Sequence, residues 1–165
     1  MNYNQRYESK RRLMISLLLL FGIFLNMSCF KRHDQPEVCK RFFSSGPRSE
    51  KRFLSHSVED QFKLHRCSLQ QIPSIGYHSA MAEGGEKLVP FLVEKLNAKH
   101  KNRYERDLTI LAASQVLALL AISGDLDNHR YVVPLLERKI SLMKFDVDKD
   151  EATDDLKTIK ERLSK

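Results

Sequence analysis

Cysteine and histidine, the side chains most typical of zinc sites and of nucleophile–base pairs, are few: three cysteines and six histidines. Zinc sites use such residues at short regular spacings, and neither a CxxC nor an HxxxH spacing occurs here. Ser79 or Ser123 could pair with His78 or His129 as nucleophile and base, but no motif fixes such a geometry. The sequence therefore predicts no catalytic residue, no metal site and no cofactor.

Asp146, Asp148 and Asp150 have the spacing with which a calcium-binding loop begins. An EF-hand loop then requires glycine at its sixth position and glutamate at its twelfth. Glu151 and Lys157 stand at these positions, so the pattern fails where it is most diagnostic. We expect these acids instead in the first turn of a helix, where the helix dipole favours negative charge.

The N-terminal residues have the order of a secretory signal. A polar stretch ending in three basic residues, 10–12, precedes the thirteen uncharged, mostly apolar residues 13–25. Small polar residues and Cys29 follow, as at a cleavage site. As a helix, residues 13–25 would span about 20 Å, short of the hydrocarbon layer of about 30 Å. Residues 1–28 are therefore predicted to be a signal peptide, with an uncleaved anchor as the alternative.

In Ser28 and Cys29 the chain resembles bacterial lipoproteins, in which a lipobox ends at an acylated cysteine. It departs from the family pattern at Asn26, where leucine is favoured. The resemblance implies lipidation of Cys29, with palmitate among the acyl groups, and anchoring to a bacterial membrane facing the periplasm. Phe30 after the cysteine favours the outer over the inner membrane. Ordinary cleavage after Ser28, giving a soluble secreted protein, and a chance apolar helix stay open.

If Cys29 carries lipid, Cys39 and Cys67 remain as a pair. Exported proteins occupy compartments in which disulfides form and persist. A bond between these two would tie the segment after the signal to the first predicted helix and stabilise the fold by about 3 kcal/mol. Two free thiols are the alternative.

The excess of seven positive charges lies within residues 1–66, because residues 67–165 carry 15 basic and 15 acidic side chains. A nucleic-acid-binding domain places its basic face on the folded domain, so we predict no nucleic-acid partner. Residues 29–56 are interpreted as a basic linker, broken by Ser44-Ser45-Gly46-Pro47 and largely unstructured. Three phenylalanines could instead dock on the domain or on a partner: Phe42, Phe43 and Phe53.

Residues 57–165 are predicted to form a helical domain. Residues 108–122 contain only three polar side chains and no proline or glycine, which favours a central helix covered on several sides. Ser57, followed by two acids, is a predicted N-cap for a helix that ends before Pro73.

Two segments, 88–95 and 132–139, share an apolar pair, a proline, an apolar run and then charge. Pro90 and Pro134 are 44 residues apart, so the pattern resembles HEAT-like repeats, whose period is in the forties. The resemblance implies short antiparallel hairpins in a stacked, right-handed all-α arrangement. These would pair Glu86–Lys99 with Tyr104–Ser123, and Asn128–Met143 with Glu151–Leu163. An irregular helical bundle is the alternative; both place the prolines near helix starts.

These features predict a membrane-tethered module of the cell envelope, whose partner is another envelope protein and which performs no catalysis. Helical stacks bind through broad surfaces. One alternative is an envelope enzyme with a cleft lined by polar residues such as His78, His129 or Asp125. Another is a cytosol-facing anchored protein whose basic residues 40–52 meet anionic lipid or nucleic acid.

Overall fold

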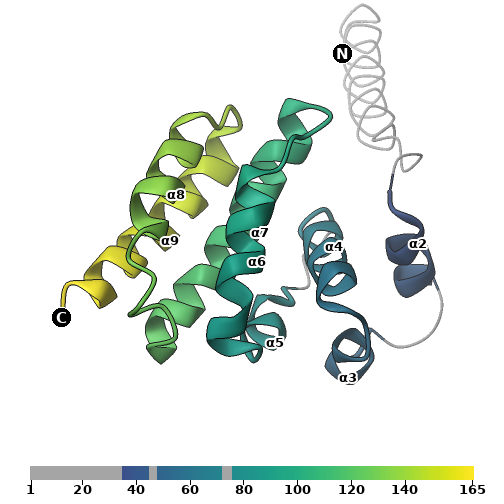
Figure 1. Cartoon of the computed structure of the whole chain (residues 1–165). Coiled ribbons are helices and arrows are strands. Elements are labelled where there is room, and N and C mark those ends of the chain that lie inside the picture. The colour runs from purple at the N-terminus through teal and green to yellow at the C-terminus, as the bar shows by residue number, and fades with distance from the viewer. Residues whose placement is uncertain (1–34, 45–47, 72–75) are drawn as a thin grey trace, which may run out of the picture. The chain divides into compact units, whose positions relative to one another are not determined.

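The computed structural model describes residues 35–44, 48–71 and 76–165, of which 36–165 form one compact unit. Every regular element of the described residues is helical and none is a strand, which confirms the all-α class for this part of the chain (Figure 1). The predicted signal peptide, residues 1–28, and Cys29 lie outside the described residues. In chain order the elements are α2 (Glu37–Ser44), α3 (Glu50–Leu54), α4 (Val58–Ser68), α5 (His78–Ala82), the 3-10 turn η2 (Gly85–Lys87), α6 (Leu88–Asn97), α7 (Arg103–Ser123), α8 (Val132–Ser141) and α9 (Asp146–Leu163).

The core is organised around α7, as predicted. This helix packs against α4, α5, α6, α8 and α9. Asn102 begins it by accepting a hydrogen bond from the Glu105 backbone N–H at 2.8 Å, and Gly124 ends it with φ of 87°. Of the described helices, α7 alone is long and apolar enough to cross a bilayer, but 78% of its most apolar window is buried inside the domain. Its apolar composition is therefore explained by its place in the core.

The polar side chains buried on α7 are engaged within the fold. The Thr109 hydroxyl donates to the Glu105 carbonyl at 2.8 Å. Asp107 is fully buried and accepts the Lys144 backbone N–H at 2.7 Å, while Arg106 lies 2.9 Å from its other carboxylate oxygen. Asp107 therefore fixes the turn before α9 to the first part of α7.

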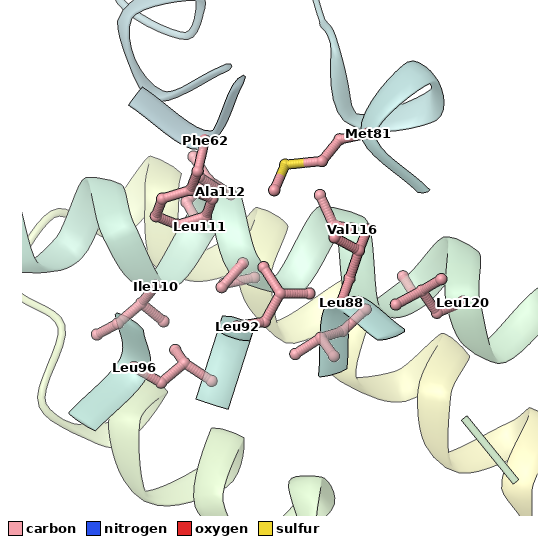
Figure 2. Packing of buried hydrophobic residues seen from close by; sticks show 14 of the residues in the cluster. Phe62, Met81, Leu88, Leu92, Leu96, Ile110, Leu111, Ala112, Val116 and Leu120 are labelled. Carbon is pink, nitrogen blue, oxygen red and sulfur yellow. The ribbon is translucent and has the colours of Figure 1, made fainter. Parts of the chain in front are cut away.

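Two helix pairs build the C-terminal half. Figure 2 shows Leu88, Leu92 and Leu96 of α6 along α7 in reverse order to Ile110, Val116 and Leu120, so these helices are antiparallel. The chain reverses direction between α8 and α9 (Figure 1), and the two helices contact each other, with Lys160 Nζ 2.5 Å from the Glu137 carboxylate.

Pro90 and Pro134 are each the third residue of their helix, α6 and α8. The prediction that both lie near helix starts is confirmed. There the missing N–H breaks no intrahelical bond.

Helix boundaries differ from those expected in two places. Helix α8 begins at Val132, after a series of turns from Asp125, whereas Asn128 was expected. Helix α9 begins at Asp146, five residues before Glu151. Asp146 and Asp148 occupy the first turn of α9, as the dipole argument predicted.

The prediction of an unstructured linker is wrong for 37–44 and 50–54, which form α2 and α3. Phe42 and Phe53 are buried in the core, and the Phe53 ring stacks on Tyr77 with centroids 4.6 Å apart. Burial of these aromatic rings outweighs the chain-breaking composition of the segment. The breaker residues 45–47 are outside the described part of the chain.

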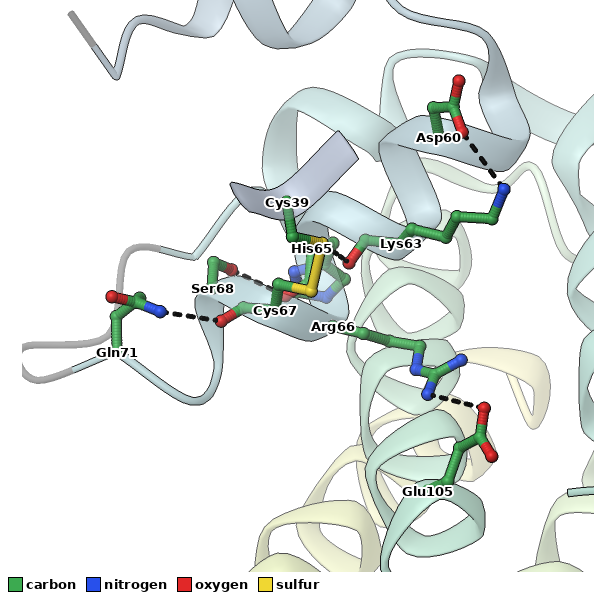
Figure 3. Close-up of a disulfide and its surroundings, with 9 residues drawn as sticks. All are labelled: Cys39, Asp60, Lys63, His65, Arg66, Cys67, Ser68, Gln71 and Glu105. Carbon is green, nitrogen blue, oxygen red and sulfur yellow. Dashed lines mark hydrogen bonds and ion pairs between the residues drawn. A yellow bond between two sulfur atoms is a disulfide. The ribbon is translucent and has the colours of Figure 1, made fainter. Parts of the chain in front are cut away.

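A disulfide joins Cys39 of α2 to Cys67 of α4, with Cα atoms 6.3 Å apart (Figure 3). Both cysteines are buried. Helix α4 itself begins as predicted, because the Ser57 hydroxyl accepts the Asp60 N–H at 3.2 Å. The bond therefore links the first described helix covalently to an element that packs on α7.

Candidate functional site

The polar residues proposed as cleft-lining candidates do not converge. His129 lies 2.9 Å from Glu86, whereas Asp125 accepts the Ser123 hydroxyl at 2.6 Å. His78 belongs to a different part of the fold, at the first turn of α5. Of the three, His78 lines the cleft described next.

This cleft, which we call the α5–α9 cleft, has a volume of about 510 Å³. It is formed by the end of α4, the start of α5, one side of α7 and the start of α9. Its apolar lining is Leu69, Leu108, Leu111 and Val147; its polar lining is His78, Tyr104, Gln115, Asp148 and Glu151, with Gly76 at one edge. Polar side chains are as numerous in its lining as apolar ones, whereas small-molecule sites are mostly apolar with a few convergent polar groups.

Gln115 is the polar centre of the cleft. Its amide Nε2 donates to the Glu151 carboxylate at 2.6 Å. Its Oε1 is buried and has no hydrogen-bond partner. A buried acceptor without a donor is uncommon in folded proteins; here the Gln115 side chain interacts with the buried His65 ring, whose nitrogens also lack a partner of good geometry.

Two neutral histidines lie behind and beside Gln115. His65 of α4 is fully buried, and its pKa is lowered to about 3. Burial is the main cause of this shift, and the positive form of His78 adds to it. Hydrogen bonding with the Ala112 carbonyl and the Gln115 side chain opposes the shift. No hydrogen bond of good geometry reaches either His65 ring nitrogen. The His65 and His78 ring centroids are 5.8 Å apart, and burial also lowers the pKa of His78. At neutral pH both rings are therefore uncharged.

The opposite wall carries acids at helical spacing. Asp148, Glu151 and Asp155 share one face of α9, and the first two line the cleft. Burial raises the pKa of Asp148, and the nearby carboxylates of Asp107 and Glu151 raise it further. Burial raises the pKa of Asp155 to about 6, although the Ser114 hydroxyl, 2.7 Å away, favours its charged form. Within the described residues none of these three acids forms an ion pair.

A second cluster surrounds His100 at the α6–α7 turn. Burial lowers the pKa of His100; Glu105 opposes this shift, and Arg66, Lys139 and Arg106 reinforce it. Two of these cations have acidic partners, because Arg66 lies 3.4 Å from Glu105 (Figure 3) and Arg106 contacts Asp107. The charged side chains of this cluster therefore mainly join neighbouring helices and contribute less to an open basic surface.

Two of the four basic residues of α2 and α3 make contacts within the domain. Arg52 lies over the Phe42 ring at 4.7 Å and donates to the Phe42 carbonyl at 3.1 Å. Arg41 pairs with Glu37 at 3.1 Å. Lys40 and Lys51 are exposed, so the alternative in which residues 40–52 meet lipid or nucleic acid stays open.

Sequence reasoning did not find Gln115, Glu151 or His65 as site residues, because they come from three helices and share no local motif. The one available signal was the spacing of Asp148, Glu151 and Asp155, which places them on one face once a helix is assumed. Among the residues that the structure describes, no three His, Cys, Asp or Glu side chains are grouped to hold a metal ion.

Comparisons of this chain with protein-family models, with curated proteins and with solved structures found no match.

Proposed function

We propose that this protein is a membrane-tethered interaction module of the bacterial cell envelope, anchored through lipid on Cys29 and facing the periplasm. It binds another envelope protein through the helical domain and catalyses no reaction. The single observation that carries the proposal is the disulfide between Cys39 and Cys67. Such bonds persist in oxidising compartments, and this pairing leaves Cys29 as the third of three cysteines.

In this proposal α6 with α7 and α8 with α9 are two HEAT-like hairpins. The prolines at the third position of α6 and α8 and the antiparallel pairing within each hairpin support it. Helices α4 and α5 cover the α7 side of the stack, which two hairpins alone would leave exposed. Helix α9, with a polar outer face, acts as the terminal cap.

Mass spectrometry of the mature N-terminus tests the anchoring. We expect a chain that begins at an acylated Cys29. A Cys29→Ser variant should lose the lipid and leave the membrane fraction, whereas a Ser28→Ala variant, which keeps a small residue before the cysteine, should not. An unprocessed N-terminus in the purified protein would overturn lipid anchoring in favour of an uncleaved anchor.

Affinity purification from detergent extract tests the interaction. We expect one partner to be recovered in a fixed ratio to the full chain, and recovery of the protein alone in repeated preparations would contradict the proposal. Protease added to spheroplasts should digest the helical domain, because the proposal places it outside the inner membrane. Protection of that domain would support the cytosol-facing alternative.

A second candidate, an envelope enzyme, is favoured by one observation: the α5–α9 cleft brings His78 next to Gln115 and Glu151. A general base must lie within hydrogen-bond reach of the proton that it removes. Turnover of any envelope substrate that His78→Gln and Glu151→Gln both abolish would establish this candidate over the interaction module.

A further inference from the structure

Three side chains from the η2 turn and the connection between α7 and α8 lie in series, and neither the cleft nor the proposed interaction uses them. Glu86 Oε1 lies 2.9 Å from His129 Nε2, although 43 residues separate the two along the chain. The other ring nitrogen, Nδ1, lies 3.3 Å from the Tyr131 hydroxyl. The sequence suggested Ser123 as a partner for His129, but the Ser123 hydroxyl donates to Asp125 at 2.6 Å. The fold therefore lines up a carboxylate, an imidazole and a phenol.

The backbone holds this series in place. The His129 N–H donates to the Leu126 carbonyl, and the His129 carbonyl accepts the Val132 N–H, each at 2.9 Å. Leu126 and Val132 are fully buried. Glu86 is the central residue of η2, and its carbonyl accepts the N–H of the buried Leu88. Both the carboxylate and the imidazole are thus carried by backbone that is anchored in the core.

The position of the hydrogen on the His129 ring follows from its partners. The ionised Glu86 carboxylate can only accept, so Nε2 donates to it. In the neutral ring Nδ1 then carries no hydrogen and accepts the hydrogen bond of the Tyr131 hydroxyl. This arrangement directs a base at a nucleophile, while the carboxylate orients the base and stabilises it once it becomes positive.

The hydroxyl end of the series is accessible. Tyr131 is 53% exposed, whereas only 18% of the His129 side chain is exposed. A reagent can therefore reach Tyr131 while most of the imidazole stays covered. Tyrosine is among the side chains that form covalent bonds to a substrate when a neighbouring base takes their proton.

The surroundings favour transfer of an acyl group over transfer of a phosphoryl group. Phosphoryl transfer depends on cations that neutralise the charge of the moving group. Among the residues described, no lysine or arginine forms a hydrogen bond or a cation–π contact with His129 or Tyr131. A phenol displaces a leaving group of lower pKa more readily; free phenol and thiol side chains have pKa values of about 10 and about 8.5. A thioester therefore fits as the acyl donor.

We propose that Tyr131 is a modification site that accepts an acyl group from a thioester, with His129 as its base and Glu86 as the residue that orients His129. Tyr131 Oη bonds to the carbonyl carbon, and its proton passes to His129 Nδ1. The carbonyl–sulfur bond breaks, the sulfur keeps the electron pair, and the ring returns the proton to it. The products are an aryl ester on Tyr131 and a free thiol. Because the acyl group stays on the chain, this inference goes beyond the proposed interaction module and adds no turnover to it.

The test treats the full chain in neutral detergent with S-phenyl thioacetate, in the presence of N-acetyltyrosine amide as an unactivated phenol. Peptide mass spectrometry follows acetylation at Tyr131 over time. We expect Tyr131 to react about tenfold faster than the free amide, a small effect for a positioned base because the site is open to water. Reaction of Tyr131 at the rate of the free amide, or more slowly, would overturn the inference.

Two variants separate activation from exposure. His129→Phe keeps a ring at this position and removes the base, so acetylation of Tyr131 should fall about tenfold. Glu86→Gln should slow it as well, because an amide that donates to Nε2 leaves Nδ1 protonated. Glu83→Gln removes an exposed acid before η2 and is the matched control; it should keep the wild-type rate. Unchanged rates in His129→Phe and Glu86→Gln would overturn the inference.

A third variant, Tyr131→Phe, identifies the attacking atom. If the tyrosine is the nucleophile, this chain should release thiophenol more slowly than the wild type during the first equivalent of reaction. Release at the wild-type rate would show that the His129 ring attacks the thioester itself, and the assignment of Tyr131 as the acceptor would be wrong.

Discussion

Helices α2 to α5 and helices α6 to α9 differ in the length of their longest members and in the contacts that join them. In the first group the longest helix, α4, has 11 residues, and its contacts include a disulfide and the stacked rings of Phe53 and Tyr77. In the second group α7 and α9 have 21 and 18 residues, and the joining groups are aliphatic side chains with one buried carboxylate, Asp107. Short helices bury little aliphatic surface each, so the first group depends on covalent and aromatic contacts.

The largest effect on the second group of helices, α6 to α9, is expected at Asp107. Asp107→Ala leaves the Lys144 N–H without its acceptor and removes the carboxylate partner of Arg106, which still donates to the Leu142 carbonyl. We expect a loss of about 3–5 kcal/mol in the free energy of unfolding, the range found when one partner of a buried charged pair is removed. Chemical denaturation of the full chain under oxidising conditions measures it. The control Asp154→Ala, an exposed acid on α9, should change stability by less than about 0.5 kcal/mol, and a similarly small loss at Asp107 would contradict the prediction.

The first group is tested by opening the disulfide. Cys39→Ser/Cys67→Ser, or reduction of the wild type, should lower the free energy of unfolding by about 3 kcal/mol. Hydrogen exchange should show lost protection in α2 and α3, while α7 and α9 keep theirs, because regions of a fold can open separately.

Cys29→Ser serves as the matched control, since it removes a cysteine outside this bond. Equal loss of protection in all helices would show that the two groups unfold together and would contradict the difference between them.

Asp155 and His65 should make the two groups respond oppositely to pH. The pKa of Asp155 is raised from 3.8 to about 6, so its charged form disfavours the fold, and this cost grows as pH rises from about 4 to 6. The pKa of His65 is lowered from 6.5 to about 3, so its stabilising contribution is complete above pH 6.5 and is lost as pH falls toward 3.

Asp155→Asn should therefore be more stable than the wild type by about 1–2 kcal/mol at pH 7, with the gain vanishing near pH 4. It should also lose stability more steeply than the wild type on acidification, because the His65 contribution is no longer opposed. Denaturation curves between pH 4 and 7.5 measure the difference, and Asp150→Asn is the control. A gain in stability that does not change with pH would contradict its attribution to the raised pKa of Asp155.

The smallest effect is expected at Gly76, at the edge of the cleft. A Cβ added there would lie 2.5 Å from His78 Cε1 and 2.6 Å from its Nδ1, so Gly76→Ala must displace the ring. We expect a loss of about 0.5–1 kcal/mol in stability and a rise in the pKa of His78, because the ring leaves its buried position. NMR titration of His78 measures its pKa, with Ser79→Ala as an exposed control. An unchanged His78 signal would show that the backbone at Gly76 shifts and the ring keeps its position.

Much of the second group could be predicted because its signals are local. The composition of residues 108–122 indicated the central helix, and the prolines marked the starts of α6 and α8. The Ser57 cap and the left-handed Gly124 follow equally local rules.

The first group and the cleft could not be predicted in the same way. Helices α2 and α3 are short and lie beside chain-breaking residues, and what stabilises them is distant: Tyr77 for Phe53, and Cys67 for Cys39. The α5–α9 cleft is formed by side chains from the end of α4 and from α5, α7 and α9. These helices are brought together by tertiary packing, which residue spacing in the sequence does not indicate.

The disulfide also determines how the domain would respond to tension on the chain before Pro36. Force entering through Cys39 would pass directly to Cys67, so the residues between them, which include α3 and most of α4, would carry none of it. A single-molecule extension experiment on the oxidised chain would therefore lack about 90–100 Å of contour length, the reach of the bypassed residues, and reduction would restore it.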